Sequence, residues 1–553
     1  MSSPVTFATF RNPVHIPCGI RAPSISCECG ALFIINAEFF STFPRENWND
    51  DIRVVISIDF GTTYSGFAYS NKLNREHTIN DTWPGRMGQT KTNSVLQYAD
   101  SKFSKVSEWG YPALAQNPSR RNEKKTGPKP VELFKLHLGN MPDSEKPPLP
   151  KGLDYKKAIT DYLKKMGELI KETVEMRWPN LKFMNQVLIV MTVPAEYSER
   201  AYAIMRDCAY KAGLISTKNS EKLQFSTEPE AAAIYCMTVL KEYFLTDVGM
   251  NFLIVDCGGG TVDLTTRKLL ADRRLGEVTV RTGDFCGGTW RLGNKIVGRT
   301  KLWSIAVYDT NILEIKLPFT GVKEDYKPFE FDLEETVKSF FDPVIEKIIR
   351  LVSNQLNSGN GCLAIFLVGG FSESKYLQRR IKDEFRMQVK NISVPRQPQA
   401  AIVRGGLEYG LNMKTIKNRV LKWTYGIELS PQWEPGDLPE RRISHNRIRV
   451  FNKLVSRGTT VDVYQEFGHE SGPSYEDQTS AMVEIYKTPE IDGKYADEPG
   501  MEKLGELRLD FPEPHLGFNR NLKFTLTFGQ MEIRASCINQ NGKSVDTKFN
   551  LEL

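Results

Sequence analysis

A chain of 553 residues, with 40% apolar and 25% charged residues, has the composition of a folded globular protein, and its length predicts more than one domain. Its net charge of +6 comes from 73 basic and 67 acidic residues that are interspersed, which argues against nucleic-acid binding. The nine cysteines are scattered along the chain, which favours a reducing compartment over the cell exterior. No apolar run is long enough for a membrane span or for the core of a signal peptide. We therefore expect the protein in the cytoplasm, with or without the nucleus.

Residues 1–52 show no regular spacing of apolar residues, and we expect a poorly ordered N-terminal extension there. From residue 53 onward the spacing predicts a mixed α/β structure. A short apolar run of β type, residues 54–58, leads into the glycine turn DFGTT at residues 59–63, and a second β-type run follows. This segment is therefore predicted to be a β-hairpin.

Helical and strand patterns alternate in the next part of the chain. Apolar residues recur at three- and four-residue spacing between residues 154 and 178, which predicts an amphipathic helix. An apolar run over residues 186–193, ended by Pro194, predicts a strand. A second helix is predicted over residues 198–211, before Gly213.

A second glycine turn, DCGGGT at residues 256–261, repeats the features of the first and also follows an apolar run, residues 252–255. In both turns, glycine lets backbone N–H groups approach a ligand and point into one concavity, which suits phosphate oxygens. The aspartate that begins each turn offers the oxygen ligand that Mg²⁺ prefers. One such turn alone is usually only a hairpin, but two copies predict a nucleotide held between the halves of a duplicated domain.

The α/β pattern ends with a long helix from residue 332, which contains Pro343, and a strand over residues 363–368. A glycine pair, Gly369 and Gly370, is predicted to lead into a helix over residues 373–385, whose N-terminus suits a phosphate or a sugar. Beyond residue 422, apolar and polar residues alternate. This alternation predicts a separate antiparallel β domain.

In this order, the motifs resemble the heat shock protein 70 (Hsp70) family, in particular its lid-less branch typified by the A12 members. The resemblance covers residues 53–415 and rests on the two glycine turns together with four further segments: KLHLG at 135–139, TVPA at 192–195, TEPEAAA at 227–233 and LVGGFSES at 367–374. It implies an actin-like (ribonuclease H-like) ATPase domain of two lobes around a cleft that holds ATP or ADP and Mg²⁺. Residues 422–553 resemble, more weakly, the β-sandwich-like half of a peptide-binding domain.

The resemblance also implies which residues contact the nucleotide and the metal ion. The nucleotide is expected to lie against both turns and the later glycine pair, at Gly61, Thr62, Thr63, Tyr64, Gly258, Gly259, Gly260, Thr261, Gly369 and Gly370. The hydrated metal ion is expected at the two turn aspartates, Asp59 and Asp256.

Catalytic roles follow from the same resemblance. Lys135 is expected to neutralise the γ-phosphate and help place the attacking water, and Glu228 to orient that water or accept its proton, with Asp263 close by. Pro194 is expected to be the switch that senses ATP. Three of these residues have a structural alternative: Lys135 packs its alkyl chain among apolar neighbours, Glu228 begins a helix before Pro229, and Pro194 ends a strand.

Some segments depart from the family pattern. The stretch between Gly288 and Val368 is shorter than in the family by about the length of a helical hairpin. In family members this region contributes a helix whose basic residue stacks on the adenine base. Arg299 and Lys301 are the nearest candidates for that basic residue in this sequence. The connection at residues 412–417 is basic, where the family has an acidic, leucine-rich linker. We also expect no helical lid after the β domain.

Three functions remain open at this point. We favour an Hsp70-like ATP-binding protein whose slow Mg²⁺-dependent hydrolysis controls binding of an unfolded peptide or client protein, with co-chaperones as further partners. The shortened lobe and altered linker favour an inactive actin-fold scaffold instead. A small-molecule kinase uses the same fold, but the TEPEAAA segment and the β domain argue against it.

Overall fold

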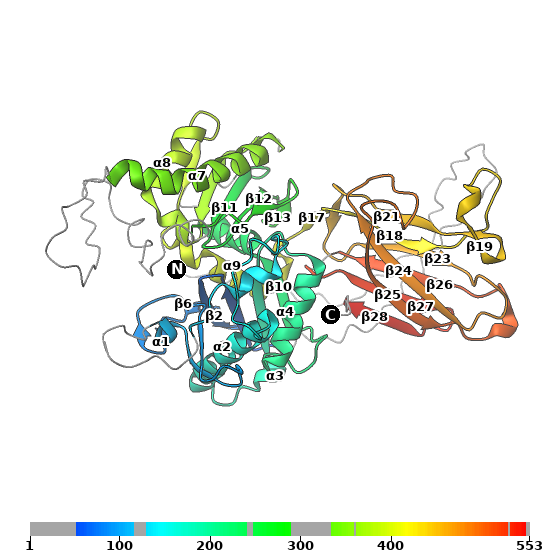
Figure 1. Ribbon diagram of the computed structural model, residues 1–553, viewed down its shortest axis with the longest axis horizontal. Helices are drawn as coiled ribbons and strands as arrows, with labels where there is room; N and C mark the ends of the chain where they lie inside the picture. Colours follow the sequence, from blue (N-terminus) through cyan, green and yellow to red (C-terminus); the bar gives the residue numbers. More distant parts are fainter. Residues whose placement is uncertain are drawn as a thin grey trace, which may run out of the picture. The chain divides into compact units, whose positions relative to one another are not determined.

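The computed structural model describes residues 51–114, 129–239, 247–288, 333–358, 361–528 and 531–548. These residues form a mixed α/β structure with several sheets, followed along the chain by a region of β-strands (Figure 1). The expected extension up to residue 50 lies outside the described residues, and so do residues 289–332 of the shortened stretch, which include Arg299 and Lys301. None of the described helices is both long and apolar enough to cross a bilayer.

The first sheet has six strands in the order β10-β9-β1-β2-β3, and β6 also pairs with β2. Its central strand β1 (Val54–Phe60) is buried along its whole length, as expected for a strand covered on both faces. It pairs antiparallel with β2 (Tyr64–Asn71) and parallel with β9 (Val187–Val193), which confirms the first predicted hairpin. The other strands of this sheet are β3 (Thr78–Ile79), β6 (Thr92–Asn93) and β10 (Leu223–Thr227).

The second sheet has the order β13-β12-β11-β15-β16, with β14 beside β12. Its strand β11 (Asn251–Cys257) pairs antiparallel with β12 (Val262–Leu269) and parallel with β15 (Ala364–Val368). Each sheet therefore places one glycine turn between a central strand and its antiparallel partner. The remaining strands are β13 (Leu275–Glu277), β14 (Thr282–Asp284) and β16 (Asn391–Ser393).

Two pairs of helices cover these sheets (Figure 1). The apolar faces of α2 (Tyr155–Arg177) and α4 (Glu199–Lys211) share a core with the first sheet, and those of α7 (Leu333–Asn357) and α8 (Lys375–Phe385) share one with the second. Pro343 lies inside α7, as predicted. Two short helices, α1 (Tyr111–Leu114) and α3 (Phe183–Gln186), lie in the same part of the chain as α2 and α4.

The predicted start of α8 was wrong. The glycine pair enters a 3₁₀ helix, Gly370–Glu373, and α8 begins only at Lys375. The Ser374 hydroxyl accepts a hydrogen bond from the Leu377 N–H, which is the role of a helix N-cap. The glycine pair therefore does not present the N-terminus of α8 to a ligand.

Two further helices, α5 (Glu228–Val239) and α9 (Ala401–Leu411), pack on each other, with α9 against β1 and α5 against β11. Their crossing is so close that a Cβ atom on Gly405 would stand 1.6 Å from the Ala231 carbonyl oxygen. A side chain there forces the helices apart. The position of α5 therefore depends on a glycine in α9.

Gly405→Ala is expected to lower the free energy of unfolding by about 1–3 kcal/mol, the usual cost of overpacking a tight core. Urea unfolding of the variant and the wild type measures this. A matched control is Gly472→Ala, whose added Cβ would meet nothing closer than the Arg520 carbonyl oxygen at 3.4 Å. Equal stability of both variants would contradict the close helix crossing.

The C-terminal strands form two four-stranded antiparallel sheets that share one apolar core. One sheet contains β21 (Val450–Val455), β18 (Thr424–Leu429), β24 (Ser480–Thr488) and β25 (Glu502–Asp510). The other contains β23 (Glu466–Ser471), β26 (Leu522–Thr527), β27 (Arg534–Asn539) and β28 (Ser544–Lys548). The predicted alternation of apolar and polar residues thus corresponds to strands with one face toward this core.

Short two-stranded pairings complete the fold. One of them, β17 (Asn418–Val420) with β22 (Thr460–Asp462), lies where the chain passes from the α/β part into the C-terminal strands. The others involve β4 (Thr82–Trp83), β5 (Arg86–Met87), β7 (Leu96–Tyr98), β8 (Val106–Trp109), β19 (Arg442–Ile443) and β20 (Arg447–Ile448).

Candidate functional site

The two glycine turns lie directly against each other. A Cβ atom on Gly259 would stand 2.4 Å from Thr63 Oγ1, and one on Gly260 would stand 2.7 Å from Thr62 Oγ1. A larger residue at Gly259 or Gly260 would meet a threonine side chain of the first turn, so the approach of the two turns favours glycine at these two positions. The turns predicted to face each other across a ligand site are therefore in contact.

A cleft of about 1050 Å³ extends along the meeting turns. It is lined by nearly all of the residues that the sequence predicted for the site: Asp59, Gly61, Thr62, Thr63, Tyr64, Lys135, Glu228, Asp256, Gly258, Gly259, Gly260, Thr261, Gly369 and Gly370. Asp263 and Pro194 are not part of the lining. The structure therefore brings segments from distant parts of the chain to one concave surface.

Lys135 and Glu228 form a buried ion pair in this cleft. The distance from Lys135 Nζ to Glu228 Oε1 is 2.7 Å, and their side chains are 3% and 8% exposed. Glu228 is the first residue of α5, as its structural alternative predicted. The alternative for Lys135, a lysine on an apolar strand with its ammonium in solvent, was wrong, because Lys135 lies on a 3₁₀ helix, Phe134–Leu138, and its ammonium is buried. Burial raises the pKa of Glu228, although the Lys135 ammonium opposes this rise.

Two more carboxyl groups are buried beside the second turn. Burial, reinforced by Glu228 and Asp263, raises the pKa of Asp256 well above its ordinary value. Burial likewise raises the pKa of Asp263 to about 8. Within the described residues, Asp256 Oδ1 and Asp263 Oδ2 have no hydrogen-bond partner. Unpaired buried oxygens are costly, so these two atoms suit a ligand that donates a hydrogen bond or carries positive charge.

Pro194 lies directly after the last residue of β9, as the strand-end alternative predicts. The next backbone N–H, that of Ala195, donates a 2.8 Å hydrogen bond to Asp263 Oδ1. The end of β9 in the first sheet is thereby connected to a carboxyl group of the second sheet. Pro194 thus precedes the residue that binds the buried Asp263 carboxyl, and neither Pro194 nor Asp263 lines the cleft.

The charges of the site fit a divalent cation. Four buried carboxyl groups, those of Asp59, Glu228, Asp256 and Asp263, are opposed by two lysine side chains. Over the described residues, no three acidic, histidine or cysteine side chains gather into a complete metal cage. Mg²⁺ needs no such cage, because it is usually held by one or two carboxylates together with phosphate oxygens and water.

The second lysine is Lys91, which the sequence did not single out. Its Nζ lies 2.5 Å from Asp59 Oδ2. The cleft is also lined by Arg86 and Tyr111, whose guanidinium and ring are stacked with 4.7 Å between Cζ and the ring centroid. Arg86 lies in the two-residue strand β5, Tyr111 begins the short helix α1, and Lys91 immediately precedes β6. These elements are too short to show a regular apolar pattern, so no local signal in the sequence marks the three residues.

Comparison with known proteins identifies the family. Heat shock 70 kDa protein 12A of Homo sapiens is 27% identical to this chain, over 88% of the chain and 89% of that protein. Heat shock 70 kDa protein 12B of Homo sapiens is 23% identical, over 96% and 95%. The chain is an Hsp70-family protein similar to 12A and 12B.

The Hsp70 resemblance predicted from the motifs is thereby confirmed, and it extends over nearly the whole chain. A heat shock 70 kDa protein of Emericella nidulans is 24% identical over 54% of the chain and 47% of that protein. The scan against models of known protein families found no match.

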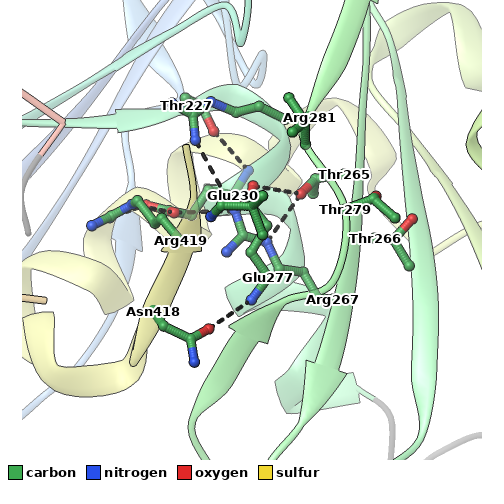
Figure 2. Close-up of polar contacts among 12 residues, drawn as sticks. Thr227, Glu230, Thr265, Thr266, Arg267, Glu277, Thr279, Arg281, Asn418 and Arg419 are labelled. Atoms are coloured by element: carbon green, nitrogen blue, oxygen red, sulfur yellow. Dashed lines mark hydrogen bonds and ion pairs between the residues drawn. The ribbon is translucent and has the colours of Figure 1, made fainter. Parts of the chain in front are cut away.

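This Hsp70-family chain also contains a buried ionic network two residues away from Glu228 (Figure 2). Glu230 is completely buried and accepts hydrogen bonds from Arg419 Nη2 at 2.8 Å and from Arg267 Nη2 at 3.2 Å. Arg267 Nη2 also donates to Glu277 Oε1 at 3.2 Å. Arg419 belongs to β17, so the network joins the first turn of α5 to the strand that leads toward the C-terminal sheets.

Proposed function

We propose that this Hsp70-family protein binds ATP with Mg²⁺ in the cleft between the two sheets, hydrolyses it slowly, and uses the nucleotide to control binding of a protein or peptide partner. The observation that carries the proposal is the contact between two glycine turns beside the buried Lys135–Glu228 pair. The same strand arrangement around both turns supports a duplicated, actin-like two-lobed domain over residues 53–415. Residues 422–553 are proposed as a second, β-sandwich-like domain.

The proposed chemistry is mainly positioning and charge stabilisation, which is most of what phosphoryl transfer needs from a protein. Backbone N–H groups of the two turns would hold the phosphate oxygens, with Gly369 and Gly370 nearer the nucleoside. Asp59 and Asp256 would hold Mg²⁺ through its water molecules, and the bound ion would offset the phosphate charge. In this arrangement the positively charged Mg²⁺ lies between the negatively charged phosphates and the carboxylates of Asp59 and Asp256.

The attacking water is proposed to lie beside the buried ion pair. Glu228 Oε1 accepts from Lys135, and a carboxylate held this way can also accept a hydrogen bond from water. A raised pKa brings the carboxyl group nearer to the range in which it exchanges a proton at neutral pH. Lys135 would then stabilise the charge that develops on the γ-phosphate.

Control of a partner requires a physical link between the cleft and the C-terminal sheets. Arg206 of α4 donates a 2.6 Å hydrogen bond from Nε to Glu532 Oε1. Lys487 Nζ of β24 lies 2.5 Å from Glu199 Oε2, at the first residue of α4. α4 packs on the same sheet as the first glycine turn. These contacts support coupling between nucleotide binding and the C-terminal sheets.

Binding of ATP by the purified full-length chain, measured by calorimetry with Mg²⁺, and single-turnover hydrolysis test this proposal. A working ATPase converts bound ATP without any acceptor molecule. ATP binding without turnover would favour the scaffold alternative, and turnover only on addition of a small-molecule acceptor would favour the kinase. Absence of ATP binding at millimolar concentration would contradict the proposal.

A further inference from the structure

Lys91 is fixed next to the first glycine turn. It immediately precedes β6, in which Thr92 pairs with Ser65 at the start of β2. The Tyr111 hydroxyl donates a 2.9 Å hydrogen bond to the Lys91 carbonyl oxygen. The backbone of Lys91 is therefore held on the edge of the cleft, and its side chain begins close to the turn.

A glycine allows the Lys91 side chain to reach into the cleft. Gly66 lies opposite Asp59 in the β1–β2 ladder, and a Cβ atom on Gly66 would stand 3.1 Å from Lys91 Cγ. The Lys91 side chain is 16% exposed and that of Asp59 only 3% exposed. The ammonium group is thus placed inside the cleft and paired with Asp59, in contrast to the solvated position usual for lysine.

The Lys91 ammonium has more hydrogen-bonding capacity than this pair uses. A lysine ammonium carries three N–H donors, and Asp59 Oδ2 is the acceptor found among the described residues. Burial raises the pKa values of Glu228 and Asp256, and the charge of Lys91 opposes both rises. Lys91 therefore acts electrostatically on the same space as the proposed metal ligands.

We propose that Lys91 is a further phosphate-binding residue of this cleft, which bridges Asp59 and a phosphate oxygen and supplies positive charge whether or not a divalent cation is bound. The inference rests on the proposed nucleotide binding. Phosphates bring negative charge into a cleft that already holds buried carboxyl groups, and a fixed ammonium offsets part of this repulsion. Nucleotide binding should therefore keep a component that does not require Mg²⁺.

The test is calorimetric binding of ATP to the full-length protein, once with Mg²⁺ and once with EDTA. Lys91→Met is expected to weaken ATP binding in EDTA by about tenfold or more, the scale of a hydrogen bond to a charged group. The loss in Mg²⁺ should be smaller, because the metal ion supplies charge at the same carboxylate. Lys91→Arg, which keeps the charge, should restore most of the binding in EDTA.

Lys105→Met is the matched control, because Lys105 is exposed and removing it changes the net charge equally. Melting temperatures of the variants verify that each one folds. Wild-type affinity of Lys91→Met in EDTA, or a wild-type protein that binds ATP only with Mg²⁺, would overturn the role of Lys91 alone. A wild-type protein that binds no ATP under either condition would overturn both the proposed function and this inference.

Discussion

Lys135→Met is expected to slow single-turnover ATP hydrolysis by about 10²- to 10³-fold, the usual cost of removing one preorganised group that stabilises transition-state charge. Methionine keeps the apolar stem that packs among the neighbouring side chains, and it removes only the ammonium that lies 2.7 Å from Glu228. The remaining Glu228 can take up a proton, since burial already raises its pKa. The fold should therefore survive the substitution, and the loss should appear in the chemical step.

Glu228→Gln and the double variant show whether the pair acts as a unit. If Lys135 and Glu228 place one water together, each single variant should be nearly as slow as the double variant, because effects within a catalytic unit are not additive. Lys171→Met is a suitable control: Lys171 Nζ donates to the Gly213 carbonyl at 2.8 Å, away from the cleft. Wild-type hydrolysis by Lys135→Met, with ATP still bound, would refute the assigned role.

The cleft lining could be predicted from the sequence because its residues have strong local requirements. The tight turns in DFGTT and DCGGGT need glycine for their own backbone geometry. Each turn follows a buried strand, which the sequence shows as an uninterrupted run of apolar residues. The order of such motifs then points to the Hsp70 family. Each of these features is determined by residues within a few positions of the motif, so it can be recognised in the sequence.

Other parts of the site depend on contacts between distant segments. Lys91 enters the cleft because β6 pairs with β2 and because Gly66 leaves room, and neither condition is visible near Lys91 in the sequence. The start of α8 was misplaced because Ser374 caps the helix more effectively than the earlier glycines. Glu230 lies in a helix that begins with acidic residues, a pattern more typical of a solvated helix start than of a buried ion pair.

Glu230→Gln is expected to lower the free energy of unfolding by about 3–5 kcal/mol, because removing one carboxylate of a buried ionic network leaves the charges of Arg267 and Arg419 only partly compensated, by Glu277. Glu230 and Arg267 are fully buried, and Arg419 is nearly so. A neutral amide can satisfy part of the hydrogen bonding, but it cannot balance two guanidinium charges. Guanidinium chloride unfolding at neutral pH measures the difference from the wild type.

Asp272→Asn provides the comparison for an exposed pair. Asp272 pairs with Arg274 where both side chains are well exposed, so its loss should cost far less stability than the loss of Glu230. A Glu230→Gln variant that is no less stable than Asp272→Asn would show that the buried network contributes little to stability.

Acid should remove the same stabilisation from the wild type. Burial opposes the ionisation of Glu230, but Arg419 and Arg267 together lower its pKa from 4.5 to about 2. A carboxyl group with a lowered pKa in the folded protein stabilises it above the unfolded pKa, and this contribution is lost as the pH falls toward the folded pKa. The stability difference between the wild type and Glu230→Gln should therefore shrink between pH 4.5 and about 2.

The position of Arg419 gives the network a second, separate measurement. Its strand β17 is also held through the neighbouring backbone, since Glu277 Oε2 accepts a 2.8 Å hydrogen bond from the Val420 N–H. Asn418 Oδ1 in turn accepts one of 3.1 Å from the Glu277 N–H. A weakened network should therefore loosen the connecting segment at residues 412–417 before the sheets themselves unfold.

Limited trypsin digestion detects this loosening, because the segment contains Lys414 and Lys417. Glu230→Gln is expected to be cut there several times faster than the wild type under native conditions, whereas Asp272→Asn should be cut at the wild-type rate. Faster cutting at these lysines, with unchanged cutting elsewhere, would locate the effect of the network at the connection. Equal cutting in all three proteins would show that the connection is held by the surrounding strands and that Glu230 acts only within the core.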